Sequence, residues 1–378
     1  MPSGRAPGLC ARPSRLKGEV VRVHLVNPSD MSYGTAIITP RWLFVLAAAT
    51  PAVYGDPVIC DETLQAFDPT TLQHGDVVGI GIHTGNALRG YQIGRAAHEQ
   101  GAWVVYGGIH ATLFPDESFE LGNADAVVKG DVAGGEALHD CAGVGPRRLY
   151  ESGRIGAEQF LPARWDLLPP NRYMWASVQT VRGCPKHCSF CSVWRTDGQK
   201  PRQRNVEMAI EEIVELRRRG FRFLALADDN FYPVTLTDLQ LAERQNNIAR
   251  LEELRSIRKE RFELMAQLSQ LPSDTVFFTQ ITMEAAEDTD FLDAMRRARI
   301  RGALVGVEAV TPEGLKAVYK DSTVPAKTLS GDCALSRNME CTCSVHSSSA
   351  SPATGRRRSG RPRNWRNGPT SRSPSLSC

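Results

Sequence analysis

The sequence has no apolar run long enough to cross a bilayer. Its longest, residues 42–53, is interrupted by Pro51, and it falls well short of the roughly 20 residues that a membrane-spanning helix needs. A charged segment leading into an apolar core and a cleavage site is also missing, so secretion is not expected. We therefore expect a cytoplasmic protein without a membrane span, and we interpret residues 42–53 as a buried helix behind the first strand.

Cysteine is too sparse for a disulfide scaffold, with ten residues in a chain of 378. In a reducing cytosol such cysteines act as thiolate ligands or as small core residues. The length is sufficient for two ordinary domains with their own cores.

A strong basic excess is missing from most of the chain. The net charge is +3, but residues 322–378 alone carry nine basic and two acidic side chains. The preceding 321 residues therefore hold 36 basic and 40 acidic side chains. This mildly acidic balance gives no electrostatic footprint for nucleic acid, and we expect no nucleic-acid partner.

Two series of short strands alternating with helices are present. Residues 1–20 lack apolar periodicity and are expected to be a disordered lead. Strands are predicted within 20–30, 76–86, 102–117 and 124–131, with a helix at 87–101. Such βαβ units predict a parallel, doubly wound sheet over residues 20–150. A proline-rich stretch in 151–176 is interpreted as a linker.

The second series occupies residues 177–321. Its predicted strands lie in 177–183, 221–230, 275–284 and 301–309, and helices are predicted at 206–220 and 288–300. The charged run 236–271 is interpreted as a solvated helix. Four strands are too few to close a barrel, so this domain is predicted to be an incomplete β/α barrel.

Residues 322–378 change character abruptly, with 13 serines and a single aromatic residue, Trp365. When degenerate codons for residues 339–351 are read two bases in, they permit an apolar strand that contains glycines. Loss of one base after the codon for Lys320 would explain this change. We predict that the tail is frameshifted and disordered, and that the barrel lacks its last two strands.

The motif that indicates most about the chemistry is a group of three cysteines, one ligand fewer than a structural zinc site needs. Cys184, Cys188 and Cys191 form the pattern C-x3-C-x2-C directly after a predicted strand. A structural zinc site is closed by four protein ligands, and His187 is a weaker candidate for the fourth. Three thiolates also suit an iron–sulfur cluster with one open iron.

This pattern, with Phe190 before the last cysteine, resembles the radical S-adenosylmethionine (SAM) superfamily. The resemblance implies a 4Fe-4S cluster on the three cysteines, whose free iron is chelated by SAM. Reduction of that cluster then cleaves SAM to a 5′-deoxyadenosyl radical that abstracts a hydrogen atom. An electron donor such as flavodoxin or ferredoxin, and a small-molecule substrate, are expected as partners.

Further SAM-binding residues are expected at the carboxyl ends of the strands, where parallel β/α folds carry their sites. The resemblance assigns the SAM amino-group contact to Asp228, Asp229 and Asn230, although the usual glycine–glycine–glutamate form is replaced here. It assigns the ribose contact to Glu308, and Glu284 is predicted to face the same opening. Phe190 completes the predicted SAM set.

The order of the two domains resembles the cobalamin-binding radical SAM family. That resemblance implies that the first domain holds cobalamin, with His83, Gly107, Gly108 and His110 as candidate lining residues. The D-x-H-x-x-G motif that supplies an axial histidine in other cobalamin proteins is absent, so no cobalt ligand is named. The implied reaction is methyl transfer to an unactivated carbon. The competing hypothesis is a truncated, inactive product that binds a cluster or zinc.

Overall fold

The computed structural model describes residues 21–130, 134–142, 145–151, 153–306 and 312–319, and these form two compact units. The first comprises residues 1–183 and 192–225, and the second comprises 184–191 and 226–378. The predicted lead, the predicted tail and Glu308 lie outside the described residues. The predicted domain boundaries and the frameshift therefore stay predictions.

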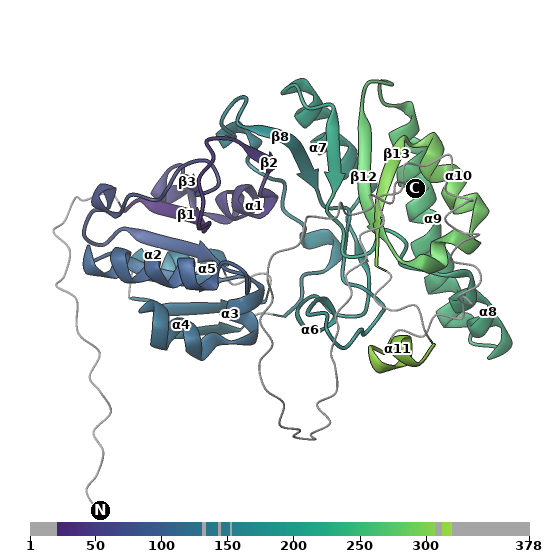
Figure 1. The fold of residues 1–378 in the computed structure, drawn as a ribbon, viewed down its shortest axis with the longest axis horizontal. Helices are drawn as coiled ribbons and strands as arrows, with labels where there is room; N and C mark the ends of the chain where they lie inside the picture. The colour runs from purple at the N-terminus through teal and green to yellow at the C-terminus, as the bar shows by residue number, and fades with distance from the viewer. Residues whose placement is uncertain (1–20, 131–133, 143–144, 152, 307–311, 320–378) are drawn as a thin grey trace, which may run out of the picture. The chain divides into compact units, whose positions relative to one another are not determined.

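The first unit is built on a parallel sheet of six strands in the order β3-β1-β4-β5-β6-β7 (Figure 1). The strands in chain order are β1 Val23–Asn27, β3 Val58–Asp61, β4 Val77–Gly81, β5 Trp103–Gly107, β6 Ala126–Lys129 and β7 Leu149–Glu151. The helices between them are α1 Arg41–Ala49, α2 Ala87–Glu99, α3 Ile109–Leu113, α4 Pro115–Gly122 and α5 Gly134–Ala142. This is the predicted doubly wound sheet, with β3 and β7 added at its edges.

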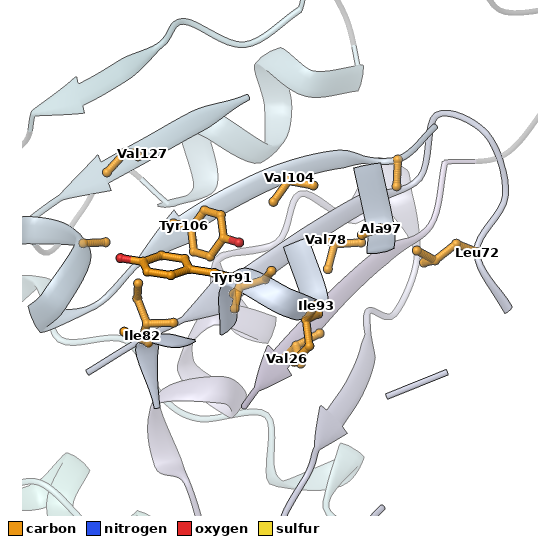
Figure 2. Packing of buried hydrophobic residues seen from close by; sticks show 14 residues of the cluster. Val26, Leu72, Val78, Ile82, Tyr91, Ile93, Ala97, Val104, Tyr106 and Val127 are labelled. Atoms are coloured by element: carbon orange, nitrogen blue, oxygen red, sulfur yellow. The ribbon is translucent and has the colours of Figure 1, made fainter. Parts of the chain in front are cut away.

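The core of this sheet lies between α2 and the central strands, as Figure 2 shows. The rings of Tyr91 and Tyr106 meet edge to face at 5.8 Å, and the Tyr106 hydroxyl donates to the carbonyls of Gly90 and Gly122. A Cβ at Gly94 would lie 1.9 Å from that hydroxyl. Glycine is therefore required on this face of α2 so that the helix can approach the sheet.

The remaining elements of the first unit include a second parallel strand pair. Strand β2 (Ala36–Ile38) pairs with β8 (Tyr173–Val178), and a short antiparallel pair joins β9 (Val181–Arg182) to β10 (Arg202–Gln203). The other elements are α6 Val193–Thr196, α7 Val206–Arg218 and β11 Phe223–Leu226.

The predicted linker contributes a buried anchor to this unit. Trp165 is 1% exposed, and its ring packs on Phe44 at 5.0 Å between centroids. Its indole nitrogen donates to Glu212 on α7 at 3.1 Å. Part of the stretch interpreted as a linker is thus integral to the packing.

In the second unit, β12 (Val276–Ile281) pairs in parallel with β13 (Ile300–Val305). The helices are α8 Leu236–Arg244, α9 Ile248–Gln270, α10 Thr289–Arg297 and α11 Pro312–Ala317, and α9 packs between α8 and α10 (Figure 1). Among the described helices, none has both the length and the apolar character needed to cross a membrane.

The charged run 236–271 differs from its interpretation as one solvated helix. It breaks into α8 and α9 at residues 245–247, and α9 buries an apolar stripe that includes Leu264 and Leu268. Arg261 is buried on the same face, with 1% of its surface exposed. The many charged residues of this run obscured the stripe in the sequence. Only the tertiary contacts show that Arg261 lies on the buried face.

Candidate functional site

The cysteine loop follows Gly183, which has a backbone conformation that only glycine adopts readily. Gly183 has φ +90°, and a Cβ there would lie 2.9 Å from the carbonyl oxygen of Lys200 and 3.0 Å from that of Gly198. Positive φ and this crowding both disfavour any other residue. The turn at Gly183 ends the strand β9 and directs the chain into the loop that begins at Cys184.

The three cysteines are half-buried, and none of them is in a disulfide. The backbone N–H of Cys191 donates to the carbonyl of Cys188 at 3.1 Å, which closes the turn between them. The pKa of Cys184 is raised to about 11, chiefly by burial, and the nearby Cys191, Cys188 and Asp229 also raise it. The three thiols and Asp229 therefore share one neighbourhood.

These thiols do not converge on a single point. Within the described ranges, no three cysteine, histidine or acidic side chains are close enough together to hold one metal ion. His187 instead stacks on the ring of Tyr319, with 6.0 Å between centroids and 23° between planes. Phe190 is 58% exposed.

A partly buried ion pair links the cysteine loop to the segment that follows β12. Lys186, between the first two cysteines, donates to Glu284 Oε1 at 2.8 Å. Burial alone would raise the pKa of Glu284, but the charge of Lys186 more than offsets it, so the pKa lies below its ordinary value. The second oxygen, Oε2, is buried and has no hydrogen-bond partner in the described part of the chain.

The segment after β11 places the second predicted group of SAM contacts beside the end of β12. The backbone N–H of Phe231 donates to the carbonyl of Gln280 at 2.9 Å. Asn230 is 2% exposed, and its Oδ1 accepts from the N–H of Tyr232. Its Nδ2 is buried without a hydrogen-bond partner among the described residues.

Asp228 has a partner from the helix layer. Its carboxylate is fully buried and lies 3.8 Å from the guanidinium of Arg261 on α9. That guanidinium also lies over the ring of Phe231, 5.3 Å from its centroid. A buried pair of this kind is satisfied internally, so the geometry distinguishes Asp228 from Asn230. Sequence reasoning missed Arg261, since nothing in the charged run marked it.

The first unit gathers its predicted residues at the carboxyl ends of β4 and β5. His83 is exposed, and its Nδ1 accepts from the N–H of Gly85 at 3.0 Å. His110 is 6% exposed, with both ring nitrogens within hydrogen-bond distance of side chains, Thr84 Oγ1 and Glu117 Oε2. A Cβ at Gly107 would meet nothing within 4 Å. Neither histidine directs a lone pair into open space.

The family match decides the class of the second half of the chain. A model of the radical SAM superfamily matches residues 178–328, which include all three cysteines, Asn230 and Glu284. This segment is a radical SAM domain. The match begins within β8, the strand that precedes the short β9.

Curated relatives of this chain include methyltransferases. It is 26% identical over 313 residues to "Hopanoid C-2 methylase" of Rhodopseudomonas palustris (strain TIE-1), covering 78% of this chain and 53% of that protein. It is 24% identical over 242 residues to "Bacteriochlorophyllide d C-12(1)-methyltransferase" of Chlorobaculum tepidum, covering 60% and 52% respectively. The chain therefore spans about half the length of these relatives.

Solved structures with the same fold carry both domains. TsrM from Kitasatospora setae, solved with cobalamin and a [4Fe-4S] cluster bound, has a TM-score of 0.60 at 17% identity, covering 87% of this chain and 67% of that one. OxsB, a cobalamin-dependent SAM radical enzyme, has a TM-score of 0.61 at 12% identity, covering 86% and 49%. These similarities confirm the predicted fold, a doubly wound domain followed by a partial β/α barrel.

Proposed function

We propose that this chain is a radical SAM enzyme that transfers a methyl group to an unactivated carbon of a small molecule, with cobalamin as the methyl carrier. The observation that carries the SAM part is a donor and an acceptor that are buried without a hydrogen-bond partner among the described residues, Asn230 Nδ2 and Glu284 Oε2. One is a donor and the other an acceptor, and buried polar groups are rarely left without a partner. The methionine end of SAM has a carboxylate for the first and an ammonium for the second.

The donor set fits an iron–sulfur cluster better than zinc. The loop offers three cysteines, whereas a structural zinc site is closed by four protein ligands. Thiolates are also the ligands of iron–sulfur clusters, and three of them would leave one iron of a 4Fe-4S cluster open. Cys184, Cys188 and Cys191 would hold this cluster, with Asp229 and Phe190 beside the SAM. When bound and reduced, the cluster supplies the electron that cleaves SAM.

Cobalamin fits the carboxyl edge of the first unit's sheet. The space over Gly107 is open, and the neighbouring loop presents polar groups. Curated relatives named as methyltransferases support methyl transfer over the inactive-product alternative. An acidic redox protein such as flavodoxin or ferredoxin is the proposed electron donor, and the cytosol is the proposed compartment. Glu308 remains the proposed ribose contact.

Anaerobic reconstitution tests the proposal directly. With iron, sulfide and a reductant, the chain is expected to gain an absorption band near about 400 nm, characteristic of protein-bound clusters with thiolate ligands, and to cleave SAM to 5′-deoxyadenosine or a methylated product. Iron and sulfide analysis and chromatography of the products measure this. Stoichiometric zinc with no cleavage of SAM would instead support the inactive alternative.

Replacing Lys186 with methionine is expected to weaken SAM binding by about 10- to 100-fold, because a hydrogen bond to a charged group contributes about 1.5–3 kcal/mol. Without the ammonium, Glu284 loses the ion pair that lowers its pKa, and the orientation of Oε2 is no longer fixed. Equilibrium dialysis with SAM measures the effect at matched iron content.

The matched control is Lys186→Arg, which keeps the charge and is expected to recover most of the affinity. Both variants should assemble the cluster, since all three thiols remain. An equal loss of SAM affinity in both variants would show that the charge pair does not position Glu284.

A further inference from the structure

The loop after β4 lies where the sheet changes winding direction. From β1 the chain crosses to β3 on one side, and it then returns to β4 on the other side of β1. In open α/β sheets, ligands bind outside the carboxyl ends of the strands at such a switch point. The ends of β1 and β4 are joined here, because Asn86 donates to the carbonyl of Pro28 at 3.0 Å and accepts from the N–H of His83.

Thr84 occupies the middle of this loop and is exposed. Its hydroxyl oxygen lies 3.2 Å from Nδ1 of the buried His110, whose Nε2 lies 3.1 Å from Glu117 Oε2. The three side chains therefore form one hydrogen-bonded chain that runs from α4 through α3 to the ligand edge of the sheet.

The direction of the hydrogen bonds among these three side chains is fixed at the Glu117 end. A carboxylate can only accept, so His110 Nε2 donates to Glu117, and in the neutral ring Nδ1 is then an acceptor. The Thr84 hydroxyl must donate its hydrogen to Nδ1. The hydroxyl then has only its oxygen lone pairs left for a ligand. Thr84 can therefore act toward that ligand only as a hydrogen-bond acceptor.

The backbone beside Thr84 leaves room for a large ligand. Gly108 has φ +92°, and a Cβ there would lie 2.6 Å from the carbonyl oxygen of Ile82. The position of Gly107 is open. Side chains are thus absent from the adjoining strand end, so a flat ligand can approach the loop closely.

We propose that Thr84 is a ligand-contacting residue of the first unit, a hydrogen-bond acceptor for bound cobalamin, and that His110 and Glu117 are positioning residues that fix its polarity. This inference rests on the proposed cobalamin binding. The matching donor is either an amide N–H at the rim of the corrin ring or the O–H of a water bound to the cobalt. Sequence reasoning named His110 as a lining residue, whereas the structure assigns the contact to the threonine that His110 orients.

The test uses the full chain titrated with hydroxocobalamin. Thr84→Val keeps the shape of the exposed side chain but removes the acceptor, and it is expected to weaken cobalamin binding about three- to tenfold. Thr84→Ser keeps the hydroxyl and is expected to bind as the wild type does. A loss of affinity with an unchanged visible spectrum identifies the corrin amide as the donor, and a loss with a shifted spectrum identifies the water on the cobalt.

Glu117→Gln tests the positioning role, since its amide can donate to His110 Nε2 and so reverse the hydrogens of the chain. A loss of affinity in the same direction as in Thr84→Val is expected, although Glu117 is far more exposed than His110. A Thr84→Val variant that matches the wild type in affinity and spectrum overturns the inference while the proposed function stands. A wild-type chain that binds no cobalamin contradicts both.

Discussion

Replacing Cys184 with alanine is expected to lower the iron and sulfide bound after anaerobic reconstitution to near background, and to abolish the cleavage of SAM. In the proposed site each of the three cysteines binds one iron of the cluster, so the loss of one thiolate leaves the cluster a ligand short. Among the described residues, the only other cysteines are Cys60 and Cys141. Iron analysis and product chromatography measure the effect.

Cys60→Ala is the matched control. Cys60 lies within β3 of the first unit and outside the C-x3-C-x2-C loop, so its replacement removes none of the three proposed ligands. This variant is expected to assemble the cluster normally. Equal iron content in Cys184→Ala and the wild type would contradict the assignment of the cluster to this loop.

Replacing Glu212 with alanine is expected to destabilise the first unit by about 3–5 kcal/mol, the cost of leaving buried charges without their partner. Glu212 is 5% exposed. Its carboxylate accepts from Arg41 at 2.7 Å and from Trp165 at 3.1 Å, and it also pairs with the buried Arg204. Helix α1, the predicted linker and α7 therefore depend on one carboxylate. Urea unfolding followed by tryptophan fluorescence measures the loss.

Glu215→Ala, three residues along the same helix, is the control. Glu215 pairs with Arg219 one turn away on the surface, with 44% of its side chain exposed. An exposed pair of this kind contributes about 0–1 kcal/mol. Similar losses of unfolding free energy in the two variants would show that the buried network is not what holds these elements together.

The Glu212 network also gives a pH dependence with a definite sign. Burial raises the pKa of this carboxyl, but Arg41 and Arg204 more than offset the effect, so the folded pKa lies below the ordinary value. The stabilisation is therefore complete above the pKa of the unfolded chain and is lost as the pH falls through the lowered pKa. The stability difference between wild type and Glu212→Ala should shrink on acidification.

The sequence by itself predicted the fold class, which the solved structures confirm, and it predicted the order of the two domains and the three thiolate ligands. Alternating apolar strands and helices are local patterns, and the spacing of Cys184, Cys188 and Cys191 is a property of one short loop. Local patterns of this kind survive in a single sequence because the residues that make them are neighbours in the chain. The short edge strands β3 and β7 were missed, because three or four residues carry too little periodicity.

Only the tertiary structure decided how the polar side chains divide between packing and chemistry. Asp228 and Asn230 are two residues apart, yet one pairs with Arg261 from a distant helix, and the other keeps a buried donor without a partner. In the same way, His110 is committed to Thr84 and Glu117. Whether a polar group is satisfied depends on residues far away in the sequence, so it cannot be judged from the chain alone.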